Sequence, residues 1–580
     1  MSAPLRPSPL LPVWLQAYQR GWLAGDLTAG VIVTVMLIPQ SLAYAMLAGL
    51  PPQIGLYASI APLVAYALFG SSMTLAVGPV AVVSLMTASA LAPLAAAGSA
   101  AYLALAVQLA LLSGVMLFVF GLLRLGALAH LLSHPVINGF ISGSAVLIAI
   151  GQLKHIFGIP VTATGVVQTV QQLVRGAPQL NLTTTGIGLG ALGLLAFSRA
   201  ALPRILRQLG VSAGAAGLCA KLAPMLAVVL GTVAVTLGQW HLTAGVKVVG
   251  QVPAGLPALA VVWPDSQSLS MLWLPALLIA VVGFVESVSV AHSLALKRQQ
   301  RIIPDKELLG LGAANVASAV CGGFPVTGGF ARSVVNFAAG ANTPLAGVVS
   351  AGLMAVVLAG LTDWFTLLPQ AVLAATIIIA VTSLIDFDTL KQVWDYDRAD
   401  AVSLLVTVLG VVVLGVEEGI LLGVVLSLGV LVWRSSHPHM AVVGRVAGTE
   451  HFRNVSRHAV ETLPDVIALR IDESLFFGNA AAVESRIMQL VDHQPSTRGL
   501  LLILSAVNRI DTTALGVLDD LQRSLGERGV VLSLAEVKGP VMDKLATTPL
   551  GKRLAGQVFL STHEAFCALS AAEKPPAAAG

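Results

Sequence analysis

A glycine-rich stretch with a single arginine, GGFPVTGGFARSVVN at residues 322–336, interrupts a strongly apolar part of the chain. Inside a membrane, a buried charge and a backbone that is not regularly helical are both costly unless they line a cavity or pack against protein. Amide groups at the start of a helix attract anions, and the fixed charge of Arg332 would add to that attraction. The stretch therefore predicts a small anion-binding site.

A second stretch, SSMTLAVGPVAVVSLM at residues 71–86, has the same organisation. A β-permissive run is broken at Gly78, and Pro79 suits the first position of the helix that follows. Gly328 and Gly329 give the other stretch a similar flexible start. Close helix packing through glycine would explain one such segment. The chain has two such segments, one in each half. If the two halves are inverted relative to each other in the membrane, this pair favours a site between two facing helix N-termini near the middle of the bilayer.

Three more polar side chains lie in segments expected to cross the membrane. Glu286 lies in VVGFVESVSVAHSLALK, residues 281–297. An acid at this depth is usually functional, so it is expected to exchange a proton or to balance Arg332; an interhelical hydrogen bond is the structural alternative. Gln40 and Tyr44 share one helical face and would hydrogen-bond an oxyanion, with plain helix–helix contact as the alternative.

The composition is that of a membrane protein: 56% of the 580 residues are hydrophobic and 10% are charged, against about 25% charged in ordinary globular domains. A spanning helix needs about 20 apolar residues. Fourteen candidate spans are found near 27–48, 54–69, 79–95, 102–122, 135–153, 183–198, 222–239, 271–292, 307–321, 329–340, 344–361, 366–382, 400–416 and 417–433. Fourteen spans form two sets of seven. Because seven is odd, the second set starts on the opposite side of the membrane from the first, which predicts an all-α inverted repeat with two half-helices.

Loop charges predict the orientation in the membrane. With the N-terminus in the cytoplasm, the inner loops carry most lysines and arginines, and the outer loops hold little more than Lys154, Arg175 and Lys247. The expected location is the inner (plasma) membrane, multi-pass, with both ends of the chain cytoplasmic. The expected domains are a cytoplasmic N-terminus at 1–20, a transmembrane domain at 21–435, a linker at 436–462, an α/β domain at 463–570 and a flexible tail at 571–580.

The C-terminal part alternates between strand-like and helix-like patterns, which predicts a small α/β domain. Its predicted strands are 466–471, 500–505 and 530–534, and its predicted helices are 480–493 and 513–529. Asp511 and Thr512 lie where the second helix begins, so either could cap it. Phosphorylation of Thr512 would place negative charge at a favourable helix start, which makes it a regulatory candidate.

Several function classes are disfavoured by the sequence. The three cysteines lie far apart, and there is no metal-ligand spacing, nucleophile–base pair or Walker loop. We therefore expect no enzyme activity, no metal, no cofactor and no direct drive by ATP. The basic residues lie in short loops and do not form a patch interleaved with aromatics, so no nucleic-acid partner is expected.

The chain resembles the sulfate permease (SulP) family of inorganic anion transporters over about residues 15–570. The motifs that carry the resemblance are PQSLAYAMLAGLPPQIGLYAS (39–59), AVGPVAVVSLM (76–86), HPVINGFISGSA (134–145), FVESVSVAHSLA (284–295) and GGFPVTGGFARSVVN (322–336). The C-terminal domain looks like a STAS domain, with NRIDTTALGVL (508–518) at its signature loop. There the chain has Asp-Thr-Thr-Ala where anti-sigma-factor antagonists have Asp-Ser-Ser-Gly.

The resemblance implies a fourteen-helix inverted repeat with core and gate domains, an elevator-like motion and a homodimer. It implies an anion site between the third and tenth helices, lined by Gln40, Tyr44 and the backbone around Thr74, Ala76, Val77, Gly78, Thr327, Gly328 and Gly329. Position 44 is often phenylalanine in the family, so Tyr44 could alter the preferred anion. Glu286 falls where proton-coupled members carry an acid.

The expected function is secondary active transport of an inorganic anion across the lipid bilayer, with sulfate and proton symport favoured. Bicarbonate or a C4-dicarboxylate is the alternative substrate, and sodium is the alternative coupling ion. A passive anion channel and a membrane-anchored signalling scaffold are the other classes.

Overall fold

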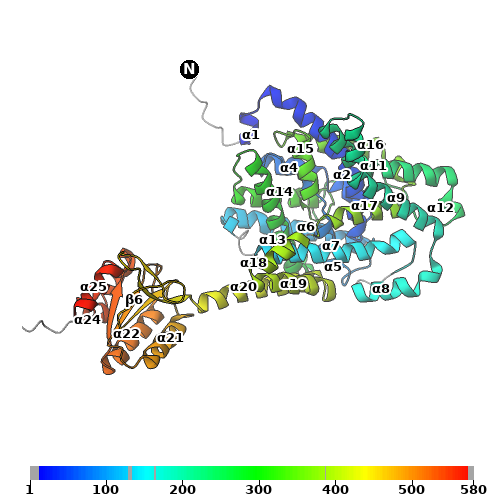
Figure 1. The fold of residues 1–580 in the computed structure, drawn as a ribbon. Coiled ribbons are helices and arrows are strands. Elements are labelled where there is room, and N and C mark those ends of the chain that lie inside the picture. Colours follow the sequence, from blue (N-terminus) through cyan, green and yellow to red (C-terminus); the bar gives the residue numbers. More distant parts are fainter. Residues whose placement is uncertain (1–11, 128–132, 162–164, 386, 573–580) are drawn as a thin grey trace, which may run out of the picture. The chain divides into compact units, whose positions relative to one another are not determined.

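A computed structural model describes residues 12–127, 133–161, 165–385 and 387–572. The chain divides into two compact units, Met1–Ser427 and Leu428–Gly580. The first unit is helical, apart from two very short strands, and the second is an α/β domain (Figure 1). The division falls within α20 (Val416–Ser436), so one continuous helix belongs to both units.

The helices of the first unit largely coincide with the predicted spans. The longer ones are α2 (Leu23–Leu47), α6 (Ala100–Leu122), α7 (His134–Phe157), α9 (Leu182–Ala200), α11 (Ala213–Gly238), α13 (Ser266–Lys297), α14 (Pro304–Val320), α16 (Leu345–Gly360) and α19 (Arg398–Val413). The shorter ones are α1 (Val13–Gln16), α3 (Pro52–Tyr57), α4 (Ala61–Phe69), α5 (Ala81–Leu91), α8 (Val166–Arg175), α10 (Leu202–Gln208), α12 (Trp240–Thr243), α15 (Phe330–Ala338), α17 (Gln370–Thr382) and α18 (Phe387–Tyr396). The sequence did not predict α1, α8, α10, α12 or α18.

Helix length alone does not recover fourteen spans. Within the described residues, six helices are long and apolar enough to cross a membrane, or seven if α9 and α10, bent by 50°, form one span. Several remaining apolar helices have only 10–17 residues, among them α5, α16 and α17. The count of fourteen and the inverted repeat therefore stay predictions.

Glycines allow close contact between α14 and its neighbours α6 and α4. A Cβ atom on Gly114 would lie 2.7 Å from the backbone nitrogen of Val316, and one on Gly312 would lie 2.7 Å from that of Phe118. Small residues are the usual means by which helix backbones approach in membranes. This packing fixes α14, which leads directly into the glycine-rich stretch at 322–336.

Two buried carboxylates join loops to helix starts in this unit. Glu307, which is fully buried, accepts hydrogen bonds from the Tyr66 hydroxyl (2.7 Å), the Ser71 hydroxyl (2.6 Å) and the backbone N–H groups of Ser71 (2.9 Å) and Ser72 (2.8 Å). Asp26 accepts in the same way from the backbone of residues 342–343. The sequence predicted neither of these contacts.

The second unit has one six-stranded sheet in the order β4-β3-β5-β6-β7-β8. The strands are β3 (Met440–Arg445), β4 (Phe452–Asn454), β5 (Val466–Ile471), β6 (Gly499–Ile503), β7 (Val531–Ala535) and β8 (Val558–Phe559). The helices are α21 (Ala480–His493), α22 (Thr512–Glu527), α23 (Gly539–Ala546), α24 (Pro549–Arg553) and α25 (Thr562–Ala572). Strands β5 to β8 are parallel, whereas β3 pairs antiparallel with both β4 and β5.

Alternating residues of β5 enter two different cores. Ile467, Leu469 and Ile471 pack on the side of α21 and α22, while Ala468 packs with Ala565 of α25. The period of two along a strand produces this division. The expected linker at 436–462 is not free of structure, because β3 and β4 fall within it and complete the sheet.

Candidate functional site

The two interrupted segments meet through a short antiparallel ladder. Strand β1 (Val77–Gly78) pairs with β2 (Thr327–Gly328), so that Val77 is opposite Gly328 and Gly78 is opposite Thr327. Helices α5 and α15 start at Ala81 and Phe330, within three residues of these strands. The residues before them, Val80 and Gly329, are extended, and neither helix start has a side-chain cap. Two uncapped helix N-termini therefore lie beside one small β-pair.

Side chains from α15 hold the ladder from one side. The Ala76 N–H donates to the Ser333 hydroxyl (3.0 Å), and the Asn336 amide donates to the Thr74 carbonyl (2.9 Å). The Gly329 N–H donates to the Ala76 carbonyl (3.1 Å). The backbone from Thr74 to Gly78 is thereby tied to the other half of the unit.

Two further helices hold the second segment. The Asn315 amide of α14 pairs with both the N–H and the carbonyl of Val326, each at 2.9 Å. Ser287 of α13 accepts from the Gly328 N–H (2.8 Å) and contacts the Thr327 hydroxyl (2.6 Å). We had not predicted Asn315, Ser287, Ser333 or Asn336 as part of the site. Their only signal in the sequence is that each is polar within an apolar helix.

Arg332 lies between the two helix starts. Its side chain is 2% exposed, and its Nη1 donates to the Pro79 carbonyl (3.1 Å). Its Nε and Nη2 are buried and have no hydrogen-bond partner among the described residues. A Cβ atom on Gly78 would lie 3.2 Å from this guanidinium, and one on Gly329 would lie 3.0 Å from it. A side chain at either position would press on the guanidinium, which packs against the backbone of both glycines.

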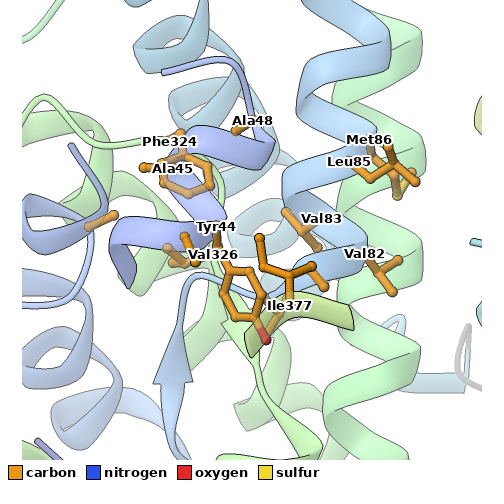
Figure 2. Packing of buried hydrophobic residues seen from close by; sticks show 14 of the residues in the cluster. Tyr44, Ala45, Ala48, Val82, Val83, Leu85, Met86, Phe324, Val326 and Ile377 are labelled. Atoms are coloured by element: carbon orange, nitrogen blue, oxygen red, sulfur yellow. The ribbon is translucent and has the colours of Figure 1, made fainter. Parts of the chain in front are cut away.

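Tyr44 of α2 lies near the site, and Gln40 lies one helical turn before it in the same helix. Tyr44 is buried, whereas Gln40 is partly exposed. In Figure 2 the Tyr44 ring lies in an apolar cluster with Val83 of α5 and Ile377 of α17. Its hydroxyl is within electrostatic range of both Arg332 and Glu286. The structure thus brings Tyr44, Arg332 and Glu286 into one region.

Glu286 of α13 borders a small pocket with an apolar lining. The other lining residues are Val136, Ile137, Phe140, Ile141, Val282, Val285 and Ile420. The Glu286 Oε2 atom is buried without a hydrogen-bond partner in the described part of the chain. Glu286 and Arg332 influence each other electrostatically, but no ion pair within 4.0 Å is found between them. The carboxylate is therefore available for a proton.

The comparison with known protein families matches both parts of the chain. The sulfate permease family matches residues 23–407. The chain belongs to the sulfate permease family. The STAS domain matches residues 457–565, so the chain also carries a STAS domain, as its resemblance implied.

Relatives of this chain are sulfate transporters by name. Sulfate transporter 4.1, chloroplastic, of Arabidopsis thaliana is 33% identical over 567 residues, which is 95% of this chain and 81% of the relative. A probable sulfate transporter of Mycobacterium tuberculosis is 34% identical over 540 residues, 93% of each chain. The family comprises transporters, which are not enzymes.

Solved structures share the fold of the permease. The murine Solute Carrier 26 family member A9 anion transporter in the inward-facing state aligns with a TM-score of 0.87 at 22% identity, covering 97% of this chain and 94% of the other. The transmembrane domain of the cyanobacterial bicarbonate transporter BicA aligns with a TM-score of 0.59 at 26% identity, covering 71% of this chain and 98% of that domain. The helical transmembrane fold with a C-terminal STAS domain is thereby confirmed.

Asp511 lies in the signature loop of the STAS domain. Its Oδ1 accepts from the Ala514 N–H (2.8 Å) and its Oδ2 from the Phe477 N–H (2.9 Å). These backbone donors, that of Ala514 first, hold the pKa of Asp511 below its usual value. Asp511 is therefore the helix cap, and Thr512 is an exposed residue in the first turn of α22.

Proposed function

We propose that this permease is a secondary active transporter of an inorganic anion, that its substrate is sulfate and that it couples uptake to a proton. The names of its relatives support sulfate as the substrate. The observation that carries the proposal is the buried Arg332 guanidinium, which has two unused donor nitrogens beside two uncapped helix starts. A buried cation with free N–H groups attracts a desolvated oxyanion strongly.

The proposed anion site combines charge and backbone donors. Arg332 supplies the fixed charge, and Tyr44 and Gln40 supply neutral hydrogen-bonding groups. The backbone of Thr74, Ala76, Val77 and Gly78 on one segment and of Thr327, Gly328 and Gly329 on the other would line the site. Because the N–H groups of Ala76, Gly328 and Gly329 are already used inside the protein, the free backbone donors would be those of the uncapped starts of α5 and α15. A site built mainly from N–H groups selects by charge and size. Oxyanions of similar size are therefore expected to compete with sulfate.

Glu286 is the proposed proton carrier. Its Oε2 has no hydrogen-bond partner within the described residues, and it lies within the electrostatic range of Arg332. Protonation would remove a negative charge from beside the anion site, so a proton and an anion would favour each other's binding. This reciprocity is the physical basis of symport in the proposal, and sodium is the alternative coupling ion.

The remaining parts of the proposal concern membrane topology and assembly. Fourteen spans in two inverted sets of seven would place the N-terminus and the STAS domain in the cytoplasm of a cell with this permease in its plasma membrane. The permease would act as a homodimer in the lipid bilayer. Phosphorylation of the exposed Thr512 would regulate it by adding charge to the start of α22.

Uptake of labelled sulfate into proteoliposomes tests the transport proposal. Accumulation above the equilibrium level, stimulated by an inward proton gradient, is the expected result. Flux that follows only the membrane voltage would indicate a passive channel. Preferential uptake of bicarbonate under a sodium gradient would favour the alternative suggested by the likeness to BicA, and a C4-dicarboxylate such as fumarate completes the set of substrates to be compared.

A further inference from the structure

Arg298 directly follows α13 and joins the end of that helix to the end of α15. Its Nη1 donates to the Ala341 carbonyl (2.6 Å), and its Nη2 donates to the Phe337 carbonyl (3.5 Å). The guanidinium carbon lies 4.4 Å from the centre of the Phe337 ring, which is the distance of a cation–π contact. Orientation in the membrane explains a positive charge in this loop, but it does not explain these contacts.

Helix α15 ends in a glycine turn, and Arg298 binds that turn. The Gly340 N–H donates to the Phe337 carbonyl (3.2 Å), the Ala341 N–H donates to the Asn336 carbonyl (3.1 Å), and Gly340 has a φ of +96°. This is the Schellman arrangement, which uses two carbonyl groups that the last turn of a helix leaves unpaired. A cation is stabilising at this end of a helix, where the dipole is negative.

Asp26 of α2 holds the next part of the same segment. Its Oδ1 accepts from the N–H groups of Asn342 (2.6 Å) and Thr343 (3.0 Å), and its Oδ2 accepts from the Thr343 hydroxyl (2.7 Å). We call the contacts of Arg298 and Asp26 with residues 337–343 the α15 anchor. The anchor ties the end of α15 to α2 and α13, the helices that carry Tyr44 and Glu286.

The composition of α15 makes it depend on such an anchor. The helix has 9 residues, and isolated helices of that length are marginally stable. Its start has no side-chain cap, and Arg332 in its first turn places a positive charge at the positive end of the dipole. Both features favour a bound anion but disfavour the helix when no anion is present. Contacts at the C-terminal end would compensate for this weakness.

The anchored end of α15 is also close to the residues that hold the ladder. Asn336, whose amide donates to the Thr74 carbonyl (2.9 Å), directly precedes Phe337. Arg332 lies four residues before Asn336 and therefore on the same face of the helix. Loosening of the C-terminal end would thus reach the support of β1 within one residue and Arg332 within about one turn.

We propose that Arg298 is a positioning residue for the anion site, because it anchors the C-terminal end of α15 and so keeps Arg332 at the ladder. The inference rests on the proposed function. Without this contact α15 would be ordered only part of the time, and the apparent affinity for the anion would fall by the fraction of ordered protein. A bound anion would restore the order, so the rate of transport at saturation would change little.

Hydrogen exchange of the full chain, measured without sulfate, tests the anchor. In Arg298→Gln, exchange at residues 330–338 should accelerate about fivefold, the size of effect of a cation at a helix end. Exchange of α14 at the parent rate should show that the variant is folded. Lys297→Gln is the matched control, because it removes the same charge from the neighbouring, exposed position. Unchanged exchange in Arg298→Gln, or equal acceleration in Lys297→Gln, overturns the proposal.

Transport kinetics in proteoliposomes test the positioning of the site. The KM for sulfate should rise about fivefold in Arg298→Gln with kcat retained, and it should stay at the parent value in Lys297→Gln. Arg298→Lys, which keeps the charge and can donate to the Ala341 carbonyl, should recover part of the loss. A parent-like KM in Arg298→Gln, together with accelerated exchange, would make Arg298 a purely structural cap and overturn the positioning role.

The two measurements separate this inference from the proposed function. Sulfate uptake by the parent protein is measured alongside the variants, and its absence would count against the proposed function. If the parent takes up bicarbonate or fumarate instead, the KM for that anion is compared in the same variants. The exchange comparison needs no transport, so it decides whether Arg298 anchors α15 in either case.

Discussion

Glu286 and Glu307 are two glutamates of the same helical unit in opposite circumstances. Glu307 is fully buried and accepts four hydrogen bonds, two of them from the backbone that leads to β1. Glu286 borders a small apolar pocket with an Oε2 that no described residue contacts by a hydrogen bond. A carboxylate with all its acceptors used stabilises a loop. One with an unused acceptor retains the capacity to bind a proton.

Replacing Glu307 is expected to have the largest effect. Glu307→Ala leaves the Tyr66 hydroxyl and the N–H groups of Ser71 and Ser72 without an acceptor. At about 1–3 kcal/mol for each buried donor, the free energy of unfolding should fall by at least about 3 kcal/mol. Thermal unfolding in detergent measures the loss. Glu418→Ala, at an exposed position of the same unit, serves as the control. Equal stability of the two variants would show that the hydrogen bonds of Glu307 do not stabilise the fold.

Arg332→Ala should separate function from stability. It removes the unused donors of the proposed site and breaks one hydrogen bond, that to Pro79. Sulfate uptake should fall by about 100-fold, since a buried charge partner is lost, while the unfolding temperature changes much less than in Glu307→Ala. If Arg332→Ala is as unstable as Glu307→Ala, the main role of Arg332 is to stabilise the fold and not to bind the anion.

A methyl group on Gly329 should act through Arg332. A Cβ atom there would lie 3.0 Å from the guanidinium, so Gly329→Ala should displace it and raise the KM for sulfate about tenfold. Gly186→Ala is a matched control, because no atom lies within 4 Å of its added Cβ. Equal KM values in the two variants would show that the guanidinium position does not matter.

Glu286→Gln should change coupling with little change in stability. The amide keeps the size of the side chain but cannot carry the proton. The severalfold stimulation of sulfate uptake by an inward proton gradient should disappear, while the unfolding temperature remains near that of the parent protein. Uptake that still responds fully to the gradient would remove Glu286 from the coupling mechanism and leave its unused acceptor unexplained.

The smallest effect is expected in the STAS domain, at Asp511→Ala. Removing the cap should speed hydrogen exchange of residues 512–516 about fivefold, with sulfate uptake unchanged. Because the pKa of Asp511 is lowered in the folded state, its contribution is complete above the unfolded value near 4 and is lost as pH falls through the lower folded value. The same acceleration in Thr512→Ala would indicate that the hydroxyl also contributes to the cap.

The breaks at Gly78 and Gly328, the strand at 466–471 and the helix at 480–493 could be read from the sequence because local residue types determine them. Glu307 could not be read, since its partners at residues 66–72 are distant in the chain. The role of Asn315 could not be predicted either, because its amide hydrogen-bonds the backbone of Val326, which lies in a different segment. Strands β3 and β4 were missed because they lie in the segment expected to be a linker, where β3 pairs antiparallel with β4 and with the distant β5. Local patterns identify where the chain must break, whereas the contacts that support the break appear only in three dimensions.

The ladder between β1 and β2 has a mechanical consequence. It fastens together two segments separated by about 250 residues, and Ser333, Asn336 and Ser287 brace it from both sides. If one half-helix is displaced, the other must move with it. The two helix starts and the ladder between them would therefore move as one rigid part. If the half-helices do move, sliding would meet the least resistance where only dispersion forces act, as in the apolar contact region of Tyr44 and Ile377.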